Sequence, residues 1–156
     1  MSKVHAFTTV DDNITNQLIN SVAVSDSAKT DYSISAEKQS VIKMDCIALW
    51  DTGATNTAIS PKVVKTLGLL TFGQKEIWGV SGANRTTIHV IDLWLPSLIT
   101  IPKLTVTMAM LGDIDVLIGM DVISKGDFAI SNFNEKTSFT FRIPSIEFTD
   151  YCKCVV

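Results

Sequence analysis

The sequence has 156 residues, of which 46% are hydrophobic and 19% are charged, and its formal net charge is −3. This composition excludes a disordered, highly charged chain and fits a domain with a sizeable core. The 13 basic residues are scattered singly, without the basic stripe typical of a nucleic-acid-binding protein. We therefore expect a single domain over residues 1–156 and no nucleic-acid partner.

The N-terminus and the cysteines exclude further classes. The first residues lack the apolar segment of a signal peptide, and no apolar run approaches membrane-spanning length, so we expect a cytoplasmic protein without a membrane partner. Three cysteines without framework spacing argue against a disulfide-stapled domain. Cys152-Lys153-Cys154 could bind a metal or carry out redox chemistry, but two free thiols are the better interpretation of so short a motif. No metal or cofactor is predicted.

The N-terminal third predicts strands separated by polar turns. Residues Val4–Val10 and Ile14–Val24 are strand-like on either side of Asp11-Asp12-Asn13. Ser25–Ser40 is polar and predicts a long surface loop or hairpin tip. Val41–Trp50 becomes continuously apolar toward its end, which indicates a buried strand.

Signals for a short helix follow. Ser60 is a favourable N-cap and Pro61 a favourable first helical residue. The apolar residues after them share one helical face: Val63, Val64 and Leu67. Gly68 is suited to the left-handed position that ends a helix.

Further strands are indicated in the middle of the chain. Glu76–Val80 and Thr86–Leu95 predict a hairpin whose tip is the small, polar segment Ser81–Arg85. Ile99–Met110 alternates with a period of two, and Val116–Ile118 reads as a short buried strand.

The C-terminal part predicts one more short helix and a closing hairpin. Asp121 is suited to cap one or two helical turns over Val122–Lys125. Phe128–Ser131 and Thr137–Arg142 predict a hairpin, and residues 145–156 a tail or a dimer-interface segment. Many short strands with one or two short helices indicate an all-β, barrel-like domain.

The tripeptide Asp51-Thr52-Gly53 follows the apolar strand that ends at Trp50. A carboxylate at the end of a buried strand is held rigidly, as an acid–base group requires. The Thr52 hydroxyl can bond to backbone or to a partner chain, and Gly53 allows another backbone to approach closely. Taken alone, the same tripeptide also fits an ordinary turn in which the aspartate bonds to the backbone two residues on.

This segment resembles the active-site motif of the retropepsin and pepsin aspartic proteases, a hydrophobic residue followed by Asp-Thr-Gly-Ala or Asp-Thr-Gly-Ser. Leu117-Ile118-Gly119 is similar to the second motif of that superfamily, and the hairpin containing Ile77–Gly82 lies where the family carries its flap. The resemblance runs from about Leu49 to Phe128. It implies a retropepsin-like acid protease barrel with one lobe per chain.

The family mechanism needs two aspartates that share one proton, because adjacent carboxylates cannot both ionise cheaply. This chain has one such motif, so the resemblance implies a homodimer in which Asp51 of each copy contributes. The catalytic set is then Asp51, Thr52 and Gly53. The expected activity is endopeptidase cleavage of an extended peptide at a hydrophobic pair, at mildly acidic pH.

By the same resemblance, one set of residues is expected to contact the peptide. It comprises Leu49, Ala54, Thr55, Asn56, Ala58 and Leu117, with the flap residues Trp78, Gly79, Val80, Ser81 and Gly82. Viral members often carry an Asp–Arg ion pair at the positions of Thr55 and Met120, so the dimer interface must be held differently here. Two alternatives stay open: a non-catalytic peptide-binding or dimerisation module with this fold, and a self-processing domain of a larger precursor.

Overall fold

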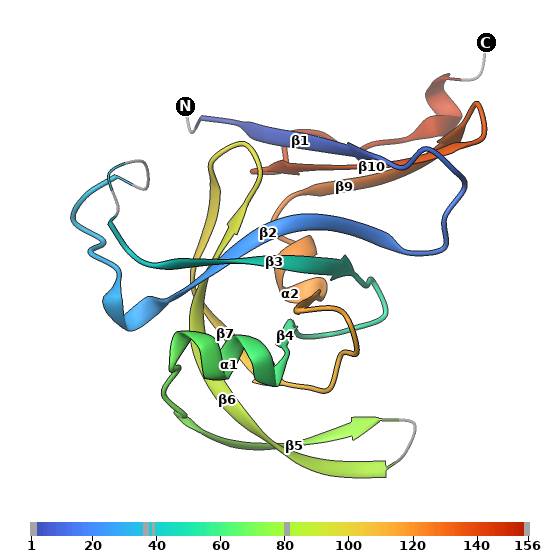
Figure 1. Ribbon diagram of the computed structural model, residues 1–156. Helices are drawn as coiled ribbons and strands as arrows, with labels where there is room; N and C mark the ends of the chain where they lie inside the picture. The colour runs from blue at the N-terminus through green and yellow to red at the C-terminus, as the bar shows by residue number, and fades with distance from the viewer. Residues whose placement is uncertain (1–2, 36–37, 39, 80–81, 155–156) are drawn as a thin grey trace.

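Strands dominate the computed structural model, which describes residues 3–35, 38, 40–79 and 82–154 (Figure 1). The strands are β1 His5–Val10, β2 Leu18–Asp26, β3 Lys43–Trp50, β4 Ala58–Ile59, β5 Gly73–Gly79, β6 Gly82–Leu95, β7 Ile99–Met108, β8 Val116–Ile118, β9 Asp127–Phe133 and β10 Lys136–Ile143. The α-helices are α1 Pro61–Leu67 and α2 Met120–Ile123, and the short 3-10 helices are η1 Ser27–Lys29 and η3 Tyr151–Cys154. The predicted all-β class is confirmed.

The larger sheet closes on itself. Its strand order is β2-β3-β8-β4-β7-β6-β5, and β2 also pairs with β6 through Ala23–Asp26. This extra pairing joins the two sides of the sheet into a barrel and leaves β5 outside the ring. The β5–β6 hairpin therefore projects away from the barrel, as the lower part of Figure 1 shows.

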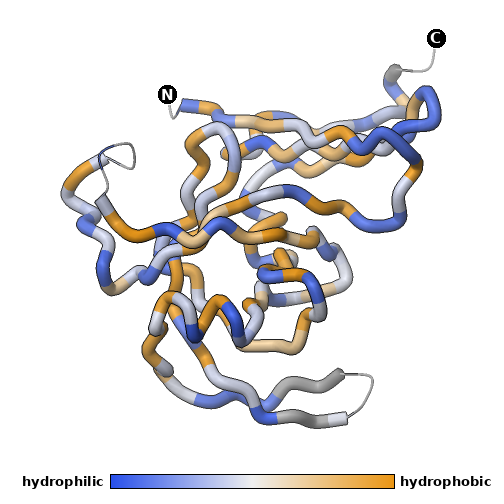
Figure 2. Tube along the Cα trace, viewed as in Figure 1, coloured by the Kyte–Doolittle hydropathy of each residue, from blue (hydrophilic) through white to orange (hydrophobic). Residues whose placement is uncertain are grey.

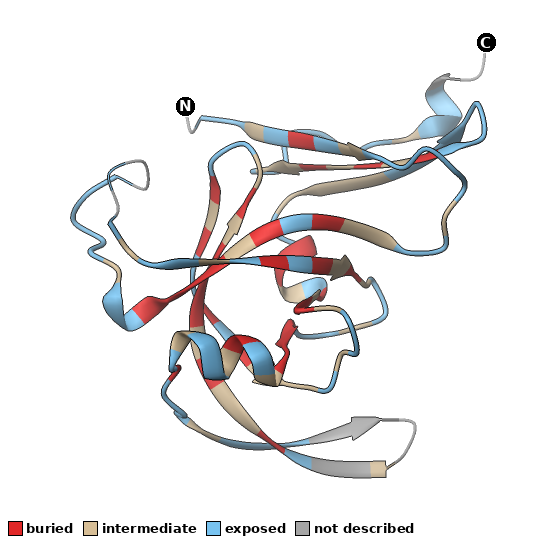
Figure 3. Cartoon of the chain, in the orientation of Figure 1, coloured by how far each residue is buried: buried red, intermediate tan, exposed pale blue. Residues whose placement is uncertain are grey.

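A second, three-stranded sheet with the order β1-β10-β9 packs against the barrel through aromatic side chains. The Trp50 ring is stacked on Phe128 with centroids 5.3 Å apart. Phe7, Phe139 and Phe141 surround the same indole. Such aromatic pairs add about 0.5–1.5 kcal/mol each beyond the burial of their area. Apolar and polar residues are interspersed along these strands (Figure 2), and buried residues concentrate where the barrel strands meet (Figure 3).

Helix α1 forms as its local signals predict. The Ser60 hydroxyl accepts a hydrogen bond from the Val63 amide at 3.4 Å, and Pro61 is the first helical residue. Gly68 ends the helix with φ 64°, a conformation that costs glycine little. Val63 is fully buried, and Val64 and Leu67 pack against the core.

The predicted surface loop starts later than Ser25, so that boundary is wrong. Ser25 and Asp26 are buried in β2, and Ser27 is buried in η1. These polar residues lie in the seam that closes the barrel, where hydrogen bonds compensate their burial. The Ser25 hydroxyl accepts from the Trp94 indole at 2.8 Å, and the Asp26 carboxylate accepts from the amide of Ala28 at 3.0 Å.

Both predicted hairpin tips are too long. Gly82–Arg85 belongs to β6, with Arg85 opposite Glu76, whereas residues 80–81 lie outside the described residues. The β9–β10 hairpin turns over Asn134 and Glu135 alone, both at positive φ of 50° and 60°. Positive φ at both central residues is the backbone that matches the twist of two-residue hairpins.

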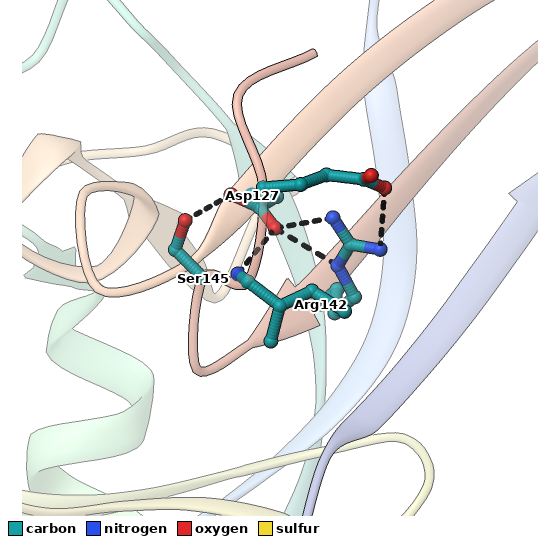
Figure 4. A network of polar contacts seen from close by, with 5 residues as sticks. Asp127, Arg142 and Ser145 are labelled. Carbon is teal, nitrogen blue, oxygen red and sulfur yellow. Dashed lines mark hydrogen bonds and ion pairs between the residues drawn. The ribbon is translucent and has the colours of Figure 1, made fainter.

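The segment after Pro144 is anchored at its start. Ser145 donates to the Asp127 carboxylate, and Arg142 donates to the same carboxylate at 2.6 and 2.8 Å (Figure 4). The segment then continues without strand pairing to η3. An interface role for residues 145–156 stays a prediction. Within the described ranges, the helices are too short to cross a membrane.

Candidate active site

Asp51 is placed by the strand that precedes it. Strand β3 pairs in parallel with β8 up to Trp50 opposite Ile118, and the Asp51 amide donates to the carbonyl of Ile118 at 2.9 Å. Trp50 is only 4% exposed, and its indole donates to Asn20 at 2.9 Å. Hydrogen bonds therefore fix both the backbone and the side chain of Trp50, the residue that precedes Asp51.

The chain turns sharply at Asp51. The Gly53 amide donates to Asp51 Oδ1 at 2.8 Å, and the Ala54 amide donates to the Asp51 carbonyl at 3.2 Å. The turn that the tripeptide predicts by itself is thus present. Asp51 is half-buried, whereas Thr52 and Gly53 are exposed on the described chain.

The loop after Asp51 is clamped onto the segment that follows β8. The amides of Met120 and Asp121 donate to the carbonyls of Ala54 and Thr55 at 2.8 and 3.2 Å. Gly119 sits so close that a Cβ there would be 2.7 Å from the carbonyl carbon of Asn56 and 2.9 Å from the Ala54 oxygen. Only glycine permits this approach, which explains the apolar-apolar-glycine motif in physical terms.

The predicted capping role of Asp121 is wrong. Helix α2 begins at Met120, its N-cap is Gly119, and no side chain caps it. The Asp121 carboxylate instead accepts the Thr57 amide at 3.0 Å and the Thr57 hydroxyl at 2.7 Å. The acidic side chain stabilises the loop after Asp51 rather than the helix, because the fold brings a partner with two donors within reach.

Beside this loop lies a cleft of about 440 Å³. Its lining includes six residues expected to contact a substrate or belong to the catalytic set: Gly53, Ala54, Thr55, Asn56, Ala58 and Leu117. Leu49 lies in β3 opposite Leu117 and is absent from this lining. Of the expected flap residues, Trp78, Gly79 and Gly82 are in the β5–β6 ladder, and Val80 and Ser81 lie outside the described residues.

Five residues that were not predicted from the sequence also line the cleft: Lys75, Glu76, Thr107, Ala109 and Leu111. Lys75 Nζ donates to Asn56 Oδ1 at 3.3 Å. Thr107 reaches the cleft because β7 pairs in parallel with β4, where it lies opposite Ala58. Period-two alternation in β7 was visible in the sequence, but this pairing has no local signal.

No cation–carboxylate pair joins Thr55 and Met120, since neither residue is charged. Within the described ranges, no cluster of three or more metal-ligating side chains occurs. The site therefore consists of one carboxylate on a rigid turn, a clamped loop and a cleft bordered by the base of the β5–β6 hairpin.

Comparison with known proteins identifies the family. The family described as gag-polyprotein putative aspartyl protease matches residues 40–125, which is more than half of the chain. The chain therefore belongs to this family of retropepsin-like aspartic proteases. The matched range includes Asp51, the β5–β6 hairpin and Gly119.

One solved structure supports the fold, and a second has a weaker similarity. A retropepsin-like aspartic protease from Rickettsia conorii matches with a TM-score of 0.53 at 10% identity, over 90% of this chain and 95% of that one. The retroviral protease-like domain of Ddi1 from Leishmania major gives a TM-score of 0.41 at 20% identity, over 62% and 85% of the two chains. The expected retropepsin-like fold is confirmed by the first structure. No curated protein sequence matches this chain.

Proposed function

We propose that this protein is an aspartic endopeptidase that works as a homodimer and cuts extended peptides at hydrophobic pairs. One observation carries the proposal: the Asp51 carboxylate accepts a hydrogen bond within a tight turn, and the residues from Gly53 to Asn56, which follow in the same loop, line a cleft, although Asp51 and Thr52 are not part of that lining. Preorganised acid–base groups beside a concave site are the usual basis of hydrolysis. Membership of the aspartyl protease family supports the same reaction class.

The chemistry requires two carboxyl groups in different protonation states. The ionised carboxylate takes a proton from a bound water as the water oxygen attacks the scissile carbonyl carbon. The protonated carboxyl gives its proton to the carbonyl oxygen, so that a neutral tetrahedral diol forms and one proton stays on the dyad. The tetrahedral diol then collapses, the C–N bond breaks, and the amine leaves with a proton from the dyad. No acyl-enzyme forms.

The second carboxyl group comes from another copy in this proposal. Asp121 holds Thr57, Asp115 pairs with Lys62 at 3.0 Å, and Asp127 pairs with Arg142 at 2.6 Å. These aspartates are thus engaged in holding the fold. A two-fold axis beside Asp51 would bring two identical carboxylates together. Thr52 and Gly53 are exposed in the single chain, as residues that contact a second copy must be.

The cleft supports an apolar preference next to the cut. Ala54, Ala58 and Leu117 are small or apolar, and an extended peptide presents alternate side chains to opposite walls. The base of the β5–β6 hairpin borders the cleft through Lys75 and Glu76, and closure of this hairpin would cover a bound peptide and exclude water.

The direct test compares Asp51→Asn with Asp113→Asn on an unstructured protein substrate. Both variants make the same chemical change, but Asp113 is exposed and lies outside the cleft lining. We expect cleavage to stop in Asp51→Asn and to continue in Asp113→Asn. Equal cleavage by Asp51→Asn and wild type would refute the catalytic assignment. Peptide binding without cleavage at any pH would favour the non-catalytic module.

A further inference from the structure

Lys75 is the one cationic side chain among the described residues that line the cleft. Its Nζ lies 3.3 Å from Asn56 Oδ1, in the loop that follows Asp51. The side chain thus crosses from the base of the β5–β6 hairpin to the opposite wall. A positive charge and an amide together form a polar boundary to a cleft whose remaining walls are mostly small or apolar.

Strand geometry separates Lys75 from its acidic neighbour, Glu76. Lys75 is opposite Thr86, which is only 7% exposed and donates to the Met108 carbonyl. This face of the ribbon is turned toward the body of the protein. Glu76 also borders the cleft, but it is opposite Arg85, and both side chains are exposed. Because side chains alternate between faces, the negative charge of Glu76 lies across from the positive charge of Arg85.

We propose that Lys75, with Asn56, selects peptides that carry an acidic side chain beyond the central hydrophobic pair. A carboxylate at that place would accept hydrogen bonds from the Lys75 ammonium and the Asn56 amide nitrogen. A lysine or arginine there would meet a like charge. This inference rests on the proposed function, since it names the substrate class of the same cleft.

Two-fold symmetry extends the preference. If two chains face one peptide, each contributes a Lys75, and the two ammonium groups lie on opposite sides of the cut. The preferred peptide then has one acidic residue on each side, with the apolar pair between them. The effect of the second acidic residue should equal that of the first.

The test uses a neutral parent peptide with a central apolar pair and two series made from it. In one series a single glutamate is moved through the flanking positions, and in the other a single lysine is moved likewise. We expect one glutamate position on each side to raise kcat/KM by about two- to fivefold, the range that exposed ion pairs provide. The gain should shrink in high salt, which screens exposed charges.

Two charge-reversal variants locate the effect. Lys75→Glu should invert the preference, so that lysine replaces glutamate as the favoured residue at the same positions. Lys65→Glu makes the same change on an exposed residue of α1 that does not line the cleft, and it should keep the glutamate preference. A Lys75→Glu variant with the wild-type preference, or a wild type without any preference, would overturn the inference.

Binding measurements separate this inference from the proposed reaction. Calorimetry would compare statine-containing forms of the parent and glutamate peptides, which bind without being cut. Preferential binding of the glutamate form without cleavage of any peptide would support Lys75 and refute the endopeptidase. Equal cleavage and equal binding of both peptides would refute the role of Lys75 alone. If neither preferential binding nor cleavage is observed, both the role of Lys75 and the endopeptidase activity are refuted.

Discussion

The carboxylate of Asp121 receives both donors of Thr57, the backbone amide at 3.0 Å and the hydroxyl at 2.7 Å. The same hydroxyl oxygen accepts the buried amide of Gly119 at 3.2 Å. The Gly119 amide, the Thr57 hydroxyl and the Asp121 carboxylate therefore form a chain of hydrogen bonds that links the segment after β8 to the loop that begins at Asp51. The rigidity of the site depends on contacts outside the Asp-Thr-Gly turn.

Thr57→Val should weaken this link. The substitution keeps the shape of the side chain but leaves the Gly119 amide buried without its acceptor, which costs about 1–3 kcal/mol. We expect the free energy of unfolding in urea to fall by that amount. Thr57→Ser retains the hydroxyl and should lose much less. Equal losses in the two variants would show that the hydroxyl does not hold the loop.

Gly119→Ala should damage both stability and activity. Its Cβ would lie 2.7 and 2.8 Å from the carbonyl carbon and oxygen of Asn56, so the loop has to move. Forced overpacking of this kind costs about 1–3 kcal/mol. The thermal midpoint and the cleavage rate should both drop. An alanine variant that melts and cuts like wild type would contradict the close approach.

The anchor of the C-terminal segment should respond to acid. The Ser145 hydroxyl and then the Arg142 guanidinium lower the pKa of Asp127 in the folded state. A lowered pKa contributes stability above the unfolded value of about 3.9, and this contribution is lost as pH falls through the folded value. Asp127→Asn removes the titrating group.

Unfolding measured from pH 3 to pH 7 checks this sign. The stability advantage of wild type over Asp127→Asn should be constant from about pH 5 to pH 7 and shrink below about pH 4. Asp113→Asn, which removes an exposed carboxylate elsewhere on the surface, is the matched control for the chemical change. A stability advantage of wild type that increases at lower pH would contradict a lowered pKa of Asp127 in the folded state.

Cys46 should be inert in the folded protein. Burial, and next the negative charge of Asp115, raise the pKa of its thiol to about 12. Since the thiolate is the reactive form, a thiol reagent at pH 8 should not label Cys46 until the protein unfolds. Exposed Cys152 should react at once in the wild-type protein. The labelling of Cys46 is therefore measured in a variant with serine at positions 152 and 154. Rapid labelling of Cys46 in this folded variant would contradict the prediction.

The sequence predicted the features that depend on neighbouring residues. Ser60, Pro61 and Gly68 define α1 because a cap acts on amides one turn away. The same reasoning fails at Asp121, whose carboxylate binds Thr57, a residue 64 positions distant. A local propensity is overruled when tertiary contact supplies better donors.

The lining of the cleft could likewise be predicted only for residues in or close to the recognised motifs in the sequence. Gly53, Ala54 and Asn56 were expected there because they belong to the recognised motif or follow it closely in the sequence. Lys75 and Thr107 reach it only through the β5–β6 hairpin and the parallel pairing of β4 with β7. Such pairings bring together segments without a shared local pattern, so the sequence gives no direct sign of these neighbours.

The most direct test of the central claim mixes wild-type chains with Asp51→Asn chains at a fixed total concentration, after full subunit exchange. If each site needs one Asp51 from each chain, an equal mixture should retain about one quarter of the wild-type cleavage rate, because random pairing leaves that share of wild-type dimers. An equal mixture with Asp113→Asn should keep the full rate. A rate of about one half with Asp51→Asn, linear in the wild-type fraction, would contradict a site shared between two chains.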